Sequence, residues 1–157
     1  MNQSNAKDLI KKALNLSVWQ AKKGTGSFLT FDMGERVAIK RKDGTTFDRG
    51  SFHLWIYLCD WEISVNGNVL ARSDAIDADI GKAVKSFDGQ KISSIDQVNI
   101  NTIEIKASDG LSITLFGNDK VYEQDDDFFI LYTPNGNVSF SKALGFNAEP
   151  AENTAIT

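Results

Sequence analysis

Apolar and polar residues alternate along most of this chain, a pattern typical of β-strands with one covered face. Turn dipeptides such as Asn66-Gly67 and Asp109-Gly110 separate several of the alternating segments and favour tight hairpins. The pattern predicts about nine or ten strands, with a further short one at 45–47 optional. The predicted strands are 16–20, 27–33, 36–41, 51–65, 68–72, 91–99, 102–107, 111–116, 128–133 and 138–141.

Two segments change to a helical period. Leu9, Ile10, Ala13 and Leu14 form one apolar stripe, which predicts a helix that Ser4 or Asn5 caps and that ends near Leu16. A second helix is predicted within 73–87 and is clearest over 79–87, before Asp88-Gly89. The chain is therefore expected to be an α+β domain of mainly antiparallel sheet, either a curved sheet or a partly open barrel, with two helices.

Ser51 to Val65 is the longest apolar run in the sequence. It contains two of the three tryptophans, the only histidine and the only cysteine. Its first half is apolar at odd and even positions, whereas its second half is apolar on one face only. We expect a central strand whose first half is covered on both faces.

Length and composition predict one globular domain. The chain has 157 residues, of which 41% are hydrophobic. We expect a single domain over 1–146 and a flexible tail over 147–157, where the residues are polar and small. No apolar run approaches the roughly 20 residues that span a bilayer. The N-terminal residues lack the apolar core of a signal peptide, and one cysteine allows no internal disulfide, so we expect a cytoplasmic protein without membrane contact.

Acidic residues dominate the chain after its first third. The net charge is −4, and the sequence from His53 onward contains sixteen acidic residues and seven basic ones. A charge bias of this kind favours a basic protein partner. The candidate partner-binding residues are Asp60, Glu62, Glu123, Asp125, Asp126 and Asp127. Basic residues over 36–49 surround one aromatic candidate, Phe47, but the acidic remainder disfavours nucleic acid as the partner.

The sequence lacks a constellation typical of catalysis, so no catalytic residue, metal or cofactor is predicted and a non-enzymatic role is favoured. His53 and Cys59 are about 20 Å apart along one strand, too far for a catalytic pair. Asp60 and Glu62 share a strand face at about 7 Å, a spacing that suits the paired carboxylates of a hydrolase. A hydrolase centred on His53 with these two acids stays open, and a solvated strand face explains the same residues.

The aromatic face of the 51–65 strand offers another role. Trp55, Tyr57 and Trp61 alternate on one predicted face, and His53 precedes them as a polar anchor. Such a face could line a pocket for a small ligand. Core packing explains the same residues.

Three segments carry a resemblance to a known group of proteins. The segments are Gly24-Thr-Gly-Ser-Phe-Leu-Thr-Phe-Asp, His53-Leu-Trp-Ile-Tyr-Leu-Cys-Asp-Trp and Leu131-Tyr-Thr-Pro-Asn-Gly. Together they resemble a group of small bacterial proteins of unassigned activity, which are similar in size and style to immunity proteins that neutralise toxins. The leading hypothesis is a non-enzymatic immunity or antitoxin protein that neutralises a basic toxin through an acidic surface. It rests on the small size of the domain, the acidic residues after the first third and the lack of a catalytic constellation.

Overall fold

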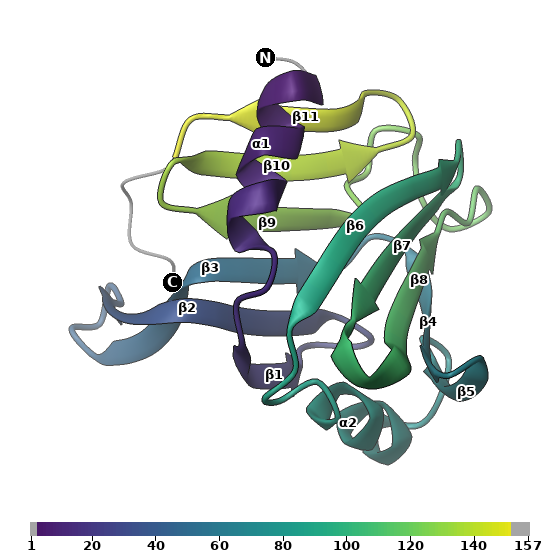
Figure 1. Ribbon diagram of the computed structural model, residues 1–157, viewed down its shortest axis with the longest axis horizontal. Coiled ribbons are helices and arrows are strands. Elements are labelled where there is room, and N and C mark those ends of the chain that lie inside the picture. The colour runs from purple at the N-terminus through teal and green to yellow at the C-terminus, as the bar shows by residue number, and fades with distance from the viewer. Residues whose placement is uncertain (1–2, 152–157) are drawn as a thin grey trace.

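The computed structural model describes residues 3–151, with side chains from residue 5 onward. Over these residues the chain forms two antiparallel sheets and two α-helices (Figure 1). The predicted α+β class with mainly antiparallel sheet is confirmed. The sheets do not close into a barrel. In the described part of the chain, no helix is long and apolar enough to cross a membrane.

The elements follow one another as two helices, one short 3-10 turn and eleven strands within the described residues. They are α1 (Gln3–Ala13), β1 (Val18–Lys23), β2 (Leu29–Lys40), β3 (Thr46–Ile56), β4 (Asp60–Val65), β5 (Asn68–Arg72), α2 (Asp77–Lys85), β6 (Ile92–Asn99), β7 (Thr102–Ala107), η1 (Ser108–Gly110), β8 (Leu111–Phe116), β9 (Phe129–Thr133), β10 (Gly136–Ser141) and β11 (Gly145–Glu149).

The core lies between the two sheets. The six-stranded sheet has the order β1-β2-β3-β9-β10-β11, and the five-stranded sheet has the order β5-β4-β8-β7-β6. Leu54 and Ile56 point into the core from the first sheet, and Trp61 and Ile63 point into it from the second. Helix α1 packs on β9, β10 and β11 through its buried stripe, so it lies over the same face of the six-stranded sheet as the second sheet does (Figure 1).

The prediction of one strand over 51–65 is wrong. The chain leaves the six-stranded sheet after Ile56 and enters the five-stranded sheet at Asp60. The core-facing positions are even up to Ile56 and odd from Cys59, so the alternation shifts by one residue between them. That shift marks the crossing from one sheet to the other. It also explains why the run looks apolar on both faces.

Other boundaries differ for local reasons. The predicted strands 27–33 and 36–41 are one strand, β2. Its pairing with β3 shifts register between Met33 and Arg36 and continues on both sides of Gly34. Helix α1 begins at Gln3, before both predicted caps, and ends at Ala13. Residues 147–149 of the predicted tail pair with β10 as part of β11, and residues 152–157 of that tail lie outside the described residues.

Candidate functional site

The outer face of the six-stranded sheet, which points away from the core, carries two rows of cross-strand neighbours. Its side chains are mostly half-buried rather than buried, because both helices and the second sheet pack on the opposite face. Side chains that are partners across antiparallel strands lie on the same face and in contact range. One row is Lys22, Thr30, Trp55, Ile130, Ser139 and Asn147, and the other is Gln20, Asp32, His53, Tyr132, Asn137 and Glu149.

An aromatic cluster stands on this outer face at the end of β3. The rings of Trp55 and Tyr57 are stacked, with centroids 3.9 Å apart and planes 7° apart. Phe28 packs edge-on against both, at 5.9 Å from Trp55 and 6.0 Å from Tyr57. Trp55 and Tyr57 are two residues apart, so their side chains project to the same side of the chain, where the two rings pack on each other.

The acidic segment 123–127 reaches the aromatic cluster through one hydrogen bond. The Tyr57 hydroxyl donates to Asp127 Oδ2 at 3.2 Å. The segment is held in place where the Glu123 amide donates to Asp126 Oδ2 at 2.8 Å and the Ala143 amide donates to the Gln124 carbonyl at 2.9 Å. The sequence analysis placed Tyr57 and Asp127 in two separate candidate sets, and the fold joins these two residues here.

The Asp127 carboxylate is in an unfavourable electrostatic environment. Burial raises the pKa of Asp127, and the negative charges of Glu149, Asp126 and Asp125 raise it further, while the Tyr57 hydrogen bond lowers it only in part. Burial and the Asp127 charge together raise the pKa of the Tyr57 hydroxyl. A cation placed beside Asp127 would relieve this cost.

A shallow hollow of 90 Å³ lies next to Asp127 on the outer face. Two carboxylates, of Asp127 and Glu149, stand on its border. Its floor and walls are Ile130, Tyr132, Asn137 and Ser139. Ile130 and the ring of Tyr132 offer apolar contacts beside two carboxylates, which suits the methylene stem and charged head of a lysine or arginine side chain.

His53 has a partner that the sequence analysis missed. Its Nδ1 lies 2.6 Å from Asp32 Oδ1, and the Gly50 amide donates to the same oxygen at 2.9 Å. Burial raises the pKa of Asp32, but the hydrogen bonds to His53 and Gly50 and the nearby positive charges outweigh it, so the net pKa is lowered. The two residues are cross-strand partners, 21 positions apart, and only the register of β2 against β3 brings them together.

The hairpin formed by β2 and β3 extends the outer face as a basic arm. Three arginines of this arm lie over aromatic rings. Their guanidinium carbons are 3.9 Å from the Trp19 ring for Arg36, 4.2 Å from the Phe47 ring for Arg41, and 4.7 Å from the Tyr132 ring for Arg49. The arm is basic on both of its sides: Arg49 and its partner Val37 lie on the outer-face side, whereas Arg36 pairs with Gly50 on the side of the core-facing Leu54. The opposite end of the outer face is acidic at 123–127 and Glu149.

The other predicted acids lie on the five-stranded sheet. Asp60 accepts a hydrogen bond from Asn118 Nδ2 at 3.1 Å. Burial raises the pKa of Tyr122, and the charges of Asp60 and Asp126 add to it, which places these two carboxylates near one ring. Glu62 pairs with Arg72 at 2.9 Å and is therefore largely neutralised. Asp60 therefore borders the acidic segment, whereas Glu62 has its own cation.

Two residues singled out by the sequence lie in the core. Trp61 is 1% exposed and its Nε1 donates to the Ser27 carbonyl at 2.7 Å, so it does not share the face of Trp55 and Tyr57. Cys59 is also 1% exposed, and burial raises the pKa of its thiol. The shift of alternation after Ile56 is the sequence signal that separates Trp61 from the outer aromatics.

The fold does not assemble the proposed hydrolase site. His53 lies on the outer face of one sheet, and Asp60 and Glu62 lie on the outward face of the other. Within residues 3–151, no group of three or more histidine, cysteine or acidic side chains is placed to hold a metal ion.

Comparisons with known proteins add no relative. No family model, no curated protein and no solved structure matches this chain.

Proposed function

We propose that this chain is a non-enzymatic binding protein of the toxin-immunity kind, which binds a basic protein surface through the outer face of its six-stranded sheet. The observation that carries the proposal is the Tyr57–Asp127 hydrogen bond, which joins the aromatic cluster to the acidic segment on one half-exposed face. Tryptophan and tyrosine dominate the energetic centres of protein interfaces, where acidic neighbours select a basic partner.

The arrangement of the rings favours a protein partner over a small planar ligand. Trp55 and Tyr57 use one ring face on each other, and Phe28 contacts the edge or face of both. A ligand that stacks on an aromatic platform needs free ring faces. The hollow of 90 Å³ beside them is also smaller than the roughly 300 Å³ at the lower end of small-molecule sites.

The charge distribution supports a basic partner held in one orientation. Glu123, Asp125 and Glu149 are exposed, and Asp126 and Asp127 are half-buried at the same end of the face. The basic arm at the other end would repel a uniformly basic surface, so the partner can dock only with its cationic patch over the acidic end. Complementary charge of this kind raises the association rate and fixes the register of a complex.

The test uses charge-neutralised variants of the full chain. The chain is used as bait in a lysate of the source cells, the captured protein is purified, and its affinity is measured by calorimetry. The site variant is Asp125→Asn, Asp126→Asn and Asp127→Asn together. A charge-matched control replaces Asp74, Asp79 and Asp109, which are exposed elsewhere on the molecule, with asparagine.

The proposal predicts that the site variant weakens binding by at least about a hundredfold, or ~2.7 kcal/mol, and that the control variant binds like the wild type. The association rate should fall with added salt for the wild type and less steeply for the site variant. Equal affinity of the site variant and the wild type would show that the partner does not bind at the 123–127 segment. A captured partner that is itself acidic would contradict the proposed chemistry.

A further inference from the structure

A second surface of the molecule is built to accept an extended peptide. We propose that the groove between α1 and the free edge of β6 binds a segment of a protein partner by strand addition, and that this segment alternates apolar and acidic residues. In strand addition, main-chain hydrogen bonds supply affinity and pockets for alternate side chains supply specificity. The inference does not depend on the outer face of the six-stranded sheet.

Strand β6 is an edge strand whose open side faces α1. It ends the order β5-β4-β8-β7-β6, so only β7 pairs with it as a strand within the described residues. An edge strand presents unpaired N–H and C=O groups that serve as a template for another chain. Val98, near the end of this strand, is 59% exposed.

The chain already uses the first residues of this edge. The Asn15 amide donates to the Ile92 carbonyl at 2.8 Å, and Ser17 forms an isolated antiparallel bridge with Lys91. The segment that follows α1 thus pairs with the start of β6, while α1 itself lies across the groove from the rest of the strand. The edge from Ser94 onward continues the same line without a pairing strand in the described structure.

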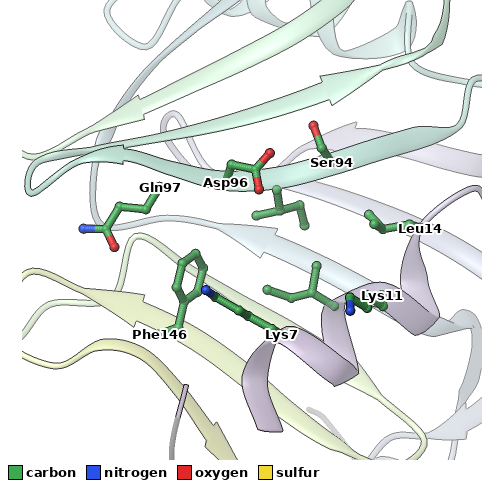
Figure 2. Close-up of a pocket in the computed structure, with 9 residues that line it drawn as sticks. Lys7, Lys11, Leu14, Ser94, Asp96, Gln97 and Phe146 are labelled. Atoms are coloured by element: carbon green, nitrogen blue, oxygen red, sulfur yellow. The ribbon is translucent and has the colours of Figure 1, made fainter. Parts of the chain in front are cut away.

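The groove lies against the backbone of β6, not against one of its faces. It has a volume of 410 Å³ and is lined on one side by four consecutive residues, Ser94 to Gln97. Consecutive residues of a strand point to opposite faces, so a groove that touches all four must run along the strand edge. Figure 2 shows this strand on one side and α1, with Lys7 and Lys11, on the other.

The two walls and the floor predict the side chains of the segment. Ile10, Ile95 and Phe146 are at most 7% exposed and form an apolar floor. Lys7 and Lys11 are exposed on α1, and neither has an ion-pair partner among the described residues. Residues four apart on a helix are about 6 Å apart, close to the roughly 7 Å between alternate residues of a strand. Two acids on alternate positions can therefore face both lysines while the residue between them meets the floor.

Two features limit the segment. The pairing of β6 with β7 is irregular at 92–94 and again at 97–99, so the regular stretch of edge is about as long as the groove. Asp96 projects beside the groove from β6, where its cross-strand neighbour is Glu104 rather than a cation. Asp96 must therefore repel an acidic segment, which gives the proposal a variant that should strengthen binding.

A second copy of the chain is not expected to fill this groove by pairing its own β6 edge with this one. A copy that presented its own β6 edge would bring its own α1 alongside that edge, and two helices would meet where one strand fits. We therefore commit to a single extended segment of another protein, with acids matched to Lys7 and Lys11.

The experiment measures fluorescence anisotropy of labelled hexapeptides with the full chain. The probe is acetyl-Val-Glu-Val-Glu-Val-Glu-amide. One control peptide has the same composition in two blocks, and another carries N-methyl groups on alternate backbone nitrogens, which removes hydrogen-bond donors from one edge. The variants are Lys7→Glu with Lys11→Glu, Asp96→Asn, and Lys12→Glu. Lys12 is an exposed lysine of the same helix that does not line the groove.

The alternating peptide should bind at least about tenfold more tightly than either control peptide. The Lys7 and Lys11 double variant should weaken it by at least about tenfold, Asp96→Asn should tighten it by about threefold, and Lys12→Glu should change it by less than about twofold. Equal binding of the N-methylated peptide would overturn strand addition. Failure of the alternating peptide to bind, or an equal loss in Lys12→Glu, would overturn the groove. A concentration-dependent dimer in sedimentation that excludes the peptide would assign the edge to a second copy and overturn the proposal as well.

Discussion

The pair formed by Asp32 and His53 gives the sharpest stability prediction of the structure. His53→Ala removes the imidazole that lies 2.6 Å from Asp32 Oδ1 and leaves the carboxylate with the Gly50 amide as its remaining hydrogen-bond donor. The Asp32 side chain is 4% exposed, so its charge would then be buried with too few partners. We expect the variant to fold but to be clearly less stable.

The magnitude follows from burial on the two sides of the pair. Removing one hydrogen-bond partner of a buried polar group costs about 1–3 kcal/mol, and more when the group is charged. The His53 side chain is 17% exposed, so water can enter the space that alanine leaves, and the Gly50 hydrogen bond persists. We therefore expect a loss of about 2–3 kcal/mol in the free energy of unfolding.

The assay is equilibrium unfolding in urea for the wild type, Asp32→Asn, His53→Ala and the double variant. The double variant should lose less than the sum of the single losses by about 1–2 kcal/mol, because removal of both partners leaves no orphaned carboxylate. The folded pKa of Asp32 is lowered from 3.8, so its stabilising contribution is present above that pH and is lost as pH falls through the lower folded value. The effect of His53→Ala should shrink accordingly below about pH 4. Strict additivity, or a loss below about 0.5 kcal/mol at pH 7, would refute this account of the pair.

Three further predictions concern single residues. Gly50→Ala should cost at least about 2 kcal/mol of unfolding free energy in urea, because a Cβ there would lie 2.4 to 2.6 Å from backbone atoms of Met33 and Phe52. Gly81→Ala, which places its Cβ in open space on α2, should instead stabilise the chain by about 0.5–1 kcal/mol. Equal effects of the two substitutions would contradict the packing around Gly50. Asp127→Asn should raise the free energy of unfolding at pH 7, because the folded pKa of Asp127 is raised from 3.8 and ionisation of this carboxyl therefore costs stability. In urea unfolding, the gain should vanish at pH values below 3.8, and a loss at pH 7 would show that the carboxylate is stabilising. Cys59 should react with a thiol reagent only at the rate of unfolding, because its thiol is buried and its pKa is raised, and fast labelling of the native chain would place it elsewhere.

Local patterns were sufficient to predict the elements that alternate cleanly. The hairpin of β7 and β8 around Asp109-Gly110 has its predicted bounds, and both helices lie where the period changes. The break between β3 and β4 was not predicted, although the buried positions change from even to odd numbers after Ile56. A long apolar run hides such a shift, because its odd-numbered and its even-numbered positions are both apolar and both are expected to be buried.

The pairings that build the outer face could not be predicted from local patterns. Asp32 meets His53, and Tyr57 meets Asp127 across 70 positions, only because β3 lies between β2 and β9. Residues 147–149 of β11 were assigned to the tail because the sequence from Asn147 onward is polar and small. Its strand character comes from pairing with β10 and from α1 packed over it, which are both tertiary contacts.

The most direct test of the proposed function is carboxyl footprinting of the chain with and without its captured partner, read by mass spectrometry. Exposed Asp and Glu side chains react with the label, and contact with a partner protects them. We expect protection of Asp125 and Glu149, with unchanged labelling of two other exposed acids, Asp74 before α2 and Asp79 within it. Protection confined to Asp74 and Asp79, or full labelling of Asp125 and Glu149 in the complex, would contradict the claim that the outer face of the six-stranded sheet binds the partner.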